Sequence, residues 1–193
     1  MKEEKPMSYV RLIERWLPIA EIGIESLRER TPMTPFPAPN RLHVWWARRP
    51  LVASRAAVLA SLLPAATDHD EFLHILGIHG DPLASRRRID RAKRVGERFE
   101  GEAYSYKRAF TYSPSPSEIA VIRERIGDNI SVLDPTAGGG AIPFESNRLG
   151  FTTYANDLNP VAATILKATV ETPQRFGSIL LDEFEDISIR FVK

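Results

Sequence analysis

The stretch Val132-Leu-Asp-Pro-Thr-Ala-Gly-Gly-Gly-Ala141 decides the predicted fold. It begins inside a short β-branched run, Ile130–Leu133, that is typical of a strand and delivers Asp134 at its carboxyl end. Three consecutive glycines then let the backbone turn sharply and leave room for ligand atoms against it. A helix is expected over 143–149, directly after this loop, so its free N–H groups face the same crevice.

A second strand is expected over 151–155, followed by Asp157 and by a helix that Pro160 opens. This alternation of helices and strands predicts the start of a parallel α/β sheet. Asp157 lies 17 residues after Gly140, where an acidic side chain can accept both hydroxyls of a ribose. Asp134 suits the ammonium group of an amino acid. One crevice can therefore hold both ends of S-adenosylmethionine.

Two other classes of glycine-rich loop fit less well. A phosphate-binding P-loop ends in Gly-Lys-Ser/Thr, whereas Gly140 is followed by Ala-Ile, so no lysine meets the phosphates. A nicotinamide or flavin site has Gly-x-Gly-x-x-Gly, and Pro143 stands where the third glycine belongs. A tight turn without a ligand is the remaining alternative, but it leaves the two spaced carboxylates unexplained.

The same residues resemble a known family. Asp134-Pro-Thr-Ala-Gly-Gly-Gly140 is similar to the Asp-Pro-Phe-x-Gly-x-Gly cofactor motif of DNA methyltransferases that methylate amino groups. Asn156-Asp-Leu-Asn-Pro160 looks like their next element, whose Asp meets the ribose. Arg11-Leu-Ile-Glu14 and Leu42-His-Val-Trp-Trp-Ala-Arg-Arg-Pro50 resemble the domain of unknown function that opens a group of large adenine-specific DNA methylases. Together these matches span roughly residues 9–172.

The resemblance implies methyl transfer from S-adenosylmethionine to the exocyclic amine of a flipped adenine in DNA. The cofactor-binding residues that it implies are Asp134, Pro135, Thr136, Ala137, Gly138, Gly139, Gly140, Asp157 and Leu158. Thr136 stands where the family has Phe, which loosens packing beneath the loop and leaves the backbone contacts in place. The family's catalytic Asn/Asp-Pro-Pro-Tyr/Phe loop does not occur in this sequence, so no catalytic residue is assigned.

The length of the chain agrees with the absence of this catalytic loop. Only 59 residues follow Asp134, and each β-α-β unit takes about 30, so about two units fit. We expect a helical N-terminal region over 1–100 and an incomplete Rossmann-like sheet over 101–193, truncated before the catalytic loop and inactive alone. The tail is expected to add a strand over 187–192 or to be unrelated sequence. A non-catalytic fragment or subunit that needs a partner chain for the catalytic half, and an RNA methyltransferase, remain alternatives.

The N-terminal region is predicted to be built from helices. Apolar residues at a spacing of three and four predict a helix over 8–30, with a buried stripe and a kink at Pro18. A proline-rich connector over 31–39 precedes a helix over 51–63 that is apolar nearly all round and hence buried. Further helices are expected over 69–77, 81–99 and 113–126, with a strand or an extended arm over 104–112.

Two places offer contacts for DNA, and the candidate residues are Trp46, Arg48, Arg49, Arg87 and Arg91. The Trp-Trp-Ala-Arg-Arg string can contact phosphate or a flipped base; alternatively, its tryptophans belong to the core and its arginines pair with carboxylates. Residues 81–100 carry seven basic and four acidic side chains, a local net charge of +3 that can follow a DNA backbone. The interspersed carboxylates equally suit an ordinary solvated helix.

The composition of the chain excludes several classes of structural site and of reaction. The chain has no cysteine, which removes disulfides, zinc ribbons and the covalent route to cytosine C5 methylation. No metal site is expected, because His43 has no ligand partner at a useful spacing. The charged N-terminus lacks a signal-peptide core, and the longest apolar stretch, Ala56–Leu63, is too short to span a membrane. A cytoplasmic protein without a membrane partner is expected.

Overall fold

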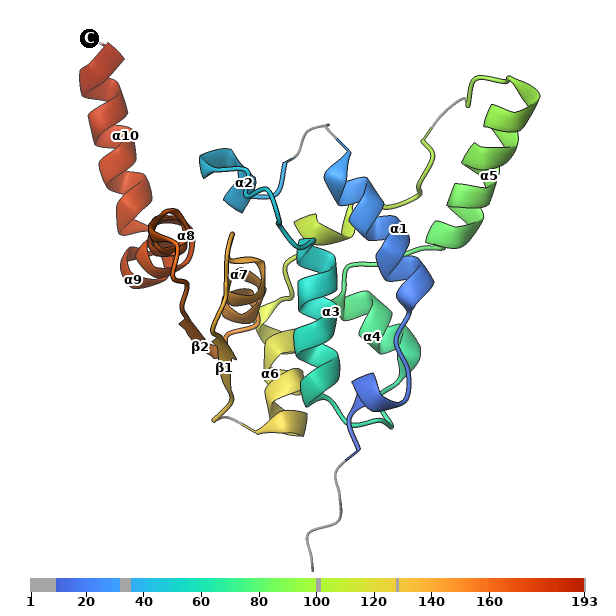
Figure 1. Cartoon of the computed structure of the whole chain (residues 1–193), viewed down its shortest axis with the longest axis horizontal. Helices are drawn as coiled ribbons and strands as arrows, with labels where there is room; N and C mark the ends of the chain where they lie inside the picture. The colour runs from blue at the N-terminus through green and yellow to red at the C-terminus, as the bar shows by residue number, and fades with distance from the viewer. Residues whose placement is uncertain (1–9, 32–35, 100–101, 128, 193) are drawn as a thin grey trace, which may run out of the picture. The chain divides into compact units, whose positions relative to one another are not determined.

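The computed structural model describes residues 10–31, 36–99, 102–127 and 129–192. Over these residues the protein is a mixed α/β structure that is mostly helical and contains one two-stranded parallel sheet (Figure 1). The mixed α/β class is therefore confirmed. The larger Rossmann-like sheet stays a prediction, because the described residues form a sheet of only two parallel strands.

The chain divides into two compact units whose boundaries differ from the expected division at residue 100. The first unit comprises Met1–Pro37 and Arg49–Ile130. The second comprises Ala38–Arg48 and Ser131–Lys193, so a short segment from the N-terminal half belongs with the sheet. Residues 102–127 stay with the first unit because they are hydrogen-bonded to its helices: the Ala109 N–H donates to Glu25 Oε2 at 3.0 Å.

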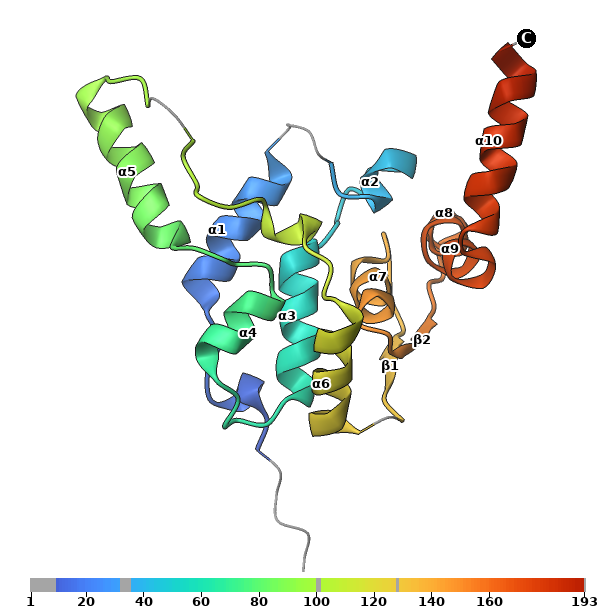
Figure 2. The ribbon, with the colours of Figure 1, turned by 180° about the vertical axis from the view of Figure 1, so that it is seen from behind.

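The first unit is helical, and its central helix is α3 (Leu51–Leu62), around which α1, α4 and α6 are arranged (Figure 2). The remaining elements are η1 (Leu12–Glu14), α1 (Ile19–Arg30), α4 (His69–Ile75), α5 (Pro82–Val95), η2 (Ala109–Thr111) and α6 (Pro116–Ile126). Val52 and Leu59 of α3 are fully buried. The prediction of a buried helix at this place is confirmed.

Helix α1 begins after Pro18, as the predicted kink requires, but the predicted apolar stripe is wrong. Leu27, which belongs to that stripe, is largely exposed, whereas Glu25 and Glu29 are buried. Glu29 is buried because backbone N–H groups at the start of α3 need a hydrogen-bond acceptor: Glu29 Oε2 and Oε1 accept the Leu51 N–H at 2.8 and 3.0 Å. This carboxylate caps α3, whose first N–H groups have no partner within the helix.

The connector and the 104–112 segment are less regular than predicted. Residues 32–35 of the connector lie outside the described residues, and Pro39 opens the short helix α2 (Pro39–Leu42). Residues 104–108 form no strand, and η2 follows them. Tyr106 shows why: its side chain turns inward, and its hydroxyl donates to Glu25 Oε1 at 2.7 Å.

The second unit contains the parallel sheet of β1 (Ser131–Asp134) and β2 (Thr152–Ala155). Helix α7 (Ala141–Arg148) connects the strands and packs against both. Register pairs Leu133 with Tyr154 and Asp134 with Ala155. Leu133 and Tyr154, which therefore share one face, are 67% and 59% exposed. One face of the sheet is thus bare among the described residues.

The unit continues with helical elements: α8 (Pro160–Leu166), the π-helix η3 (Lys167–Glu171), α9 (Thr172–Phe176) and α10 (Ile179–Val192). The predicted strand over 187–192 is wrong, since these residues belong to α10. Leu180, Phe184, Ile187 and Phe191 recur at the helical spacing of four and three, and this amphipathic period outweighs the local β-branched residues. Figure 2 shows α10, in red, extending away from α9.

Candidate cofactor site

The loop between β1 and α7 has a backbone that requires glycine at two positions. Gly138 has φ +53° and Gly140 has φ +78°, in the left-handed region that side chains rarely adopt. Gly140 is the N-cap of α7, and a Cβ there would lie 3.0 Å from Leu166 Cδ2. The sequence prediction of a sharp strand-to-helix turn is confirmed in its geometry.

Asp157 follows β2 and holds this loop from the side. Its Oδ2 accepts the Gly138 N–H at 2.8 Å, and its Oδ1 accepts the Asn159 N–H, also at 2.8 Å. These backbone hydrogen bonds, that of Asn159 first, lower the pKa of Asp157, so the side chain is ionised at neutral pH. A carboxylate offers about four acceptor positions. Two positions, one on each oxygen, therefore remain for a ligand such as a diol.

Asp134 ends β1 beside the same loop and is buried. Its Oδ1 accepts the Thr136 N–H at 3.2 Å. The Ala137 N–H donates to the Asn156 carbonyl at 2.9 Å, which ties the loop to the end of β2. Pro135 and Thr136 are exposed, as is Leu158, the neighbour of Asp157. The structure therefore gathers the sequence-predicted cofactor residues around the carboxyl ends of the two strands.

A hollow of about 490 Å³ adjoins Asp157. Tyr154 and Asp157 line it from the β2 side, and Leu166 and Val170 line it from α8 and η3. Its volume falls within the range of about 300–1,000 Å³ that small-molecule sites occupy. Sequence reasoning did not find this hollow, because it depends on where the helices after β2 pack.

Trp45 is a further residue at the loop that sequence reasoning left out of the candidate cofactor site. A Cβ on Gly138 would lie 2.8 Å from Trp45 Nε1, and one on Gly139 would lie 2.7 Å from Trp45 Cβ. The two glycines therefore admit the indole directly against the loop backbone. The contact joins residues far apart in sequence, so no local pattern could have revealed it.

The residues predicted to bind nucleic acid do not all belong to one unit: some lie in the first unit and the others in the second. Arg87 and Arg91 lie exposed on α5 of the first unit. Trp46, in the second unit, is 87% exposed, so it does not belong to the core as the structural alternative required. Arg48 Nη1 is buried and has no hydrogen-bond partner among the described residues. Arg49 is exposed at the start of the segment that returns to the first unit.

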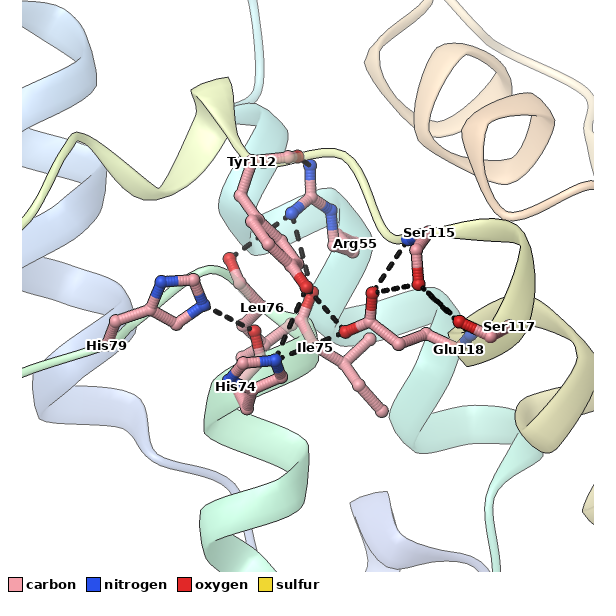
Figure 3. Close-up of polar contacts among 9 residues, drawn as sticks. All are labelled: Arg55, His74, Ile75, Leu76, His79, Tyr112, Ser115, Ser117 and Glu118. Atoms are coloured by element: carbon pink, nitrogen blue, oxygen red, sulfur yellow. Dashed lines mark hydrogen bonds and ion pairs between the residues drawn. The ribbon is translucent and has the colours of Figure 1, made fainter.

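A second polar cluster lies in the first unit, between α4 and α6 (Figure 3). Glu118 Oε2 accepts the Ser115 backbone N–H at 2.7 Å and the Ser115 hydroxyl at 2.6 Å, which completes a capping box at the start of α6. Glu118 Oε1 accepts the Tyr112 hydroxyl and lies 3.2 Å from His74 Nε2. His79 stacks on His74 at a ring distance of 4.6 Å.

Hydrogen bonding controls the ionisation of this cluster. Partial burial raises the pKa of Glu118, but donors on Ser115 and Tyr112 outweigh it and lower that pKa to about 2. Burial and the bond to Glu118 raise the pKa of Tyr112 to about 12. Since both oxygens of Glu118 are occupied by the protein's own groups, the cluster joins α4 to the start of α6 and holds the helices in place.

The comparisons with known proteins bear on the N-terminal half. Residues 16–79 match a family model described as "Protein of unknown function (DUF1156)". No curated protein matches the chain, and neither does any solved structure. The family match covers α1 to α4 and includes Trp45, but it assigns no activity.

In the part of the chain that the structure describes, no helix combines the length and apolar character that a bilayer crossing needs. No group of three or more His, Asp or Glu side chains is arranged to hold a metal ion among those residues.

Proposed function

We propose that the glycine loop binds S-adenosylmethionine and that the chain carries the cofactor-binding part of a Rossmann-like methyltransferase that methylates adenine in DNA. The observation that supports this most is the arrangement of Asp157. It combines a bond to the Gly138 N–H with free acceptor positions on both oxygens, beside a hollow of about 490 Å³. The resemblance of Asp134-Pro-Thr-Ala-Gly-Gly-Gly140 to the methylase motif points to the same ligand.

In this proposal each end of the ligand has a partner. Asp157 accepts the ribose hydroxyls, and Leu158 lies beside it to cover the adenine. Asp134 accepts the ammonium group of the methionine part, and the loop backbone from Pro135 to Gly140 lies along the chain between them. Glycine is required at Gly138 and Gly140 by their positive φ angles, and a Cβ on Gly138 or Gly139 would collide with the Trp45 side chain that packs against the loop. When bound, the cofactor supplies an electrophilic methyl group.

Calorimetry with S-adenosylmethionine and with S-adenosylhomocysteine tests this assignment. The wild type is expected to bind both, and Asp157→Ala is expected to lower the affinity at least tenfold, because it removes the acceptors for the ribose. Asp182→Ala, an exposed carboxylate on α10, serves as the matched control and should bind as the wild type does. Equal affinity of the wild type and Asp157→Ala would overturn the proposal.

We also propose that a further stretch of polypeptide, on a partner chain, supplies the catalytic Asn/Asp-Pro-Pro-Tyr/Phe loop. The bare sheet face supports this, because parallel sheets are normally covered on both faces. Leu133 and Tyr154 present apolar surface on that face. The test is co-purification with a tagged chain that contains this tetrapeptide, using Leu133→Lys as the variant that should lose the complex. Methylation activity that appears only in the complex would support the assignment.

DNA is the proposed substrate, and the first unit offers a surface for it. A hollow at the 102–111 segment is lined by basic and aromatic side chains and by one carboxylate: Arg28, Lys107, Arg108, Tyr104, Tyr106 and Glu102. Helix α5, with Arg87 and Arg91 exposed, packs beside α1 in the same unit. Basic and aromatic side chains together favour a nucleic-acid backbone and its bases. RNA offers the same groups and is the alternative substrate.

Salt dependence tests this surface directly. Each phosphate contact contributes about 0.9 to the slope of log K against log salt for duplex DNA. Arg87→Ala and Arg91→Ala should each weaken binding and reduce that slope by about 1. Arg175→Ala in α9, an exposed arginine of the second unit, is the control. An unchanged slope in both variants would remove α5 from the interface, and tighter binding to RNA than to DNA would favour the alternative substrate.

A further inference from the structure

Trp45 occupies an unusual position for a residue so far from the glycine loop in sequence. It follows α2, in the segment Ala38–Arg48 that joins the second unit from the N-terminal half. Its five-membered ring lies along the loop: the atoms nearest to Cβ positions on Gly138 and Gly139 include Nε1, Cε2, Cγ and Cδ1. The indole therefore covers the loop on the side where Gly138 and Gly139 lack a Cβ, whereas Leu166 lies at that position of Gly140.

The neighbouring Trp46 has a different environment. Its ring centroid lies 6.4 Å from that of Trp45, yet 87% of its surface is exposed, whereas Trp45 is half-buried. The two tryptophans are adjacent in sequence and equal in chemistry, so the difference between them is the contact with the loop. Trp46 is consequently a matched control for Trp45.

The loop backbone and Asp157 place geometric limits on any ligand. Asp157 is bonded to Gly138 N–H at 2.8 Å, and the indole Nε1 faces the same residue. Asp157 and the indole therefore both lie against Gly138, so a ligand that follows the loop backbone from Asp157 approaches the indole. Large, flat aromatic side chains provide extensive contact area there, and their N–H group can donate a hydrogen bond.

We infer that Trp45 is a ligand-contacting residue of the glycine-loop site, which makes part of the segment that matches DUF1156 a component of that site. This inference rests on the proposed binding of S-adenosylmethionine. It gives the segment Ala38–Arg48 a role in cofactor binding, distinct from the contact with DNA that its Trp-Trp-Ala-Arg-Arg string suggests.

The test combines affinity with fluorescence. Trp45→Ala is expected to weaken S-adenosylhomocysteine binding by about tenfold or more, because it removes the aromatic contact area. Trp45→Phe should retain most of the affinity, and Trp46→Ala should retain all of it. Thermal unfolding of each variant shows whether the fold is intact. The sequence contains three tryptophans, so Trp16→Phe with Trp46→Phe leaves Trp45 as the sole indole emitter.

In that single-tryptophan protein, emission should change on ligand addition and saturate at the affinity measured by calorimetry. A wild type that binds ligand while the Trp45 emission stays constant and Trp45→Ala binds normally overturns the inference and leaves the proposed cofactor intact. Tighter binding by Trp45→Ala also overturns it, because Trp45 would then be a plug that the ligand must displace. A wild type that binds neither compound overturns both proposals.

Discussion

The Glu29 carboxylate shows how a charged residue can be part of a helical core. It is 3% exposed, and it receives the first free N–H groups of α3 from Leu51 and Val52. A negative charge at a helix N-terminus is also stabilised by the helix dipole. Because α3 is the central helix of the first unit, the loss of this cap affects the whole unit.

Replacing Glu29 with Gln should therefore lower the free energy of unfolding of the first unit by about 1–3 kcal/mol, since Gln has no negative charge and keeps only one acceptor oxygen, with an NH2 donor in place of the other. Urea unfolding followed by circular dichroism measures the change. Glu21→Gln, on the same helix and without a capping role in the structure, is the control and should stay within about 0.5 kcal/mol of the wild type. A stability of Glu29→Gln equal to that of the control would show that the cap is dispensable.

Glu118 gives the protein a defined sensitivity to acid. Its pKa is lowered from an ordinary value of 4.5 to about 2 in the folded protein. A group with a lowered folded-state pKa contributes its full stability above its unfolded pKa, and this contribution is lost as the pH falls through the folded value. The stability of the α4–α6 contact should therefore decrease between about pH 4.5 and pH 2.

The measurement is the unfolding free energy as a function of pH for the wild type and for Glu118→Gln. The variant should be less stable at neutral pH and should show a shallower loss across the acidic window, because it has no proton to bind. Glu124→Gln, on the exposed side of the same helix, should retain the wild-type slope. If Glu118→Gln kept the steep slope, other carboxyl groups would be responsible for the acid sensitivity.

At the scale of elements, α10 differs from the other long helices because none of its described residues is buried. Phe184 and Phe191 are 71% and 90% exposed on one stripe, while Asp182, Glu183, Glu185 and Asp186 lie near them in sequence. Exposed apolar surface of this kind promotes association.

We expect Phe184→Ser combined with Phe191→Ser to lower self-association and light scattering, with thermal stability unchanged because no packed contact is removed. Sedimentation velocity at increasing protein concentration measures the effect. Glu183→Ser, on the acidic side, leaves the apolar stripe in place and is the control. Equal sedimentation of the double variant and the wild type would show that this stripe does not mediate association.

Elements with strong end signals could be predicted from the sequence. Ser115 and Glu118 form the capping box that begins α6, and Gly96 ends α5 in the left-handed conformation, both local features. The start of β1 and the glycine loop were equally local. The buried face of α1 was not predictable, because Glu25 and Glu29 serve donors that are supplied by other segments. The Trp45 contact, similarly, depends on packing across the chain.

At the scale of the whole molecule, the two units differ in how well their secondary structure is covered. Helix α3 is enclosed, whereas β2 has a bare face and pairs only with β1 among the described residues. Local opening is easiest where few buried contacts protect the backbone hydrogen bonds.

Amide hydrogen exchange should therefore be faster in β2 than in α3, by at least about tenfold. Peptides that cover Leu51–Leu62 and Thr152–Ala155 give this comparison in one mass-spectrometry experiment. Equal protection of the two segments would mean that the bare face is covered in solution, and dilution of the sample would then show whether a second molecule covers it.

The contact between Trp45 and the glycine loop also has a consequence for biosynthesis. Gly138 leaves the ribosome 93 residues later than Trp45. At a translation rate of about 5–20 residues per second, the indole waits roughly 5–20 s for its partner. During that interval it is open to chaperones and to neighbouring nascent chains. A fragment that starts after residue 48 lacks Trp45, so its glycine loop would never form this contact with the indole.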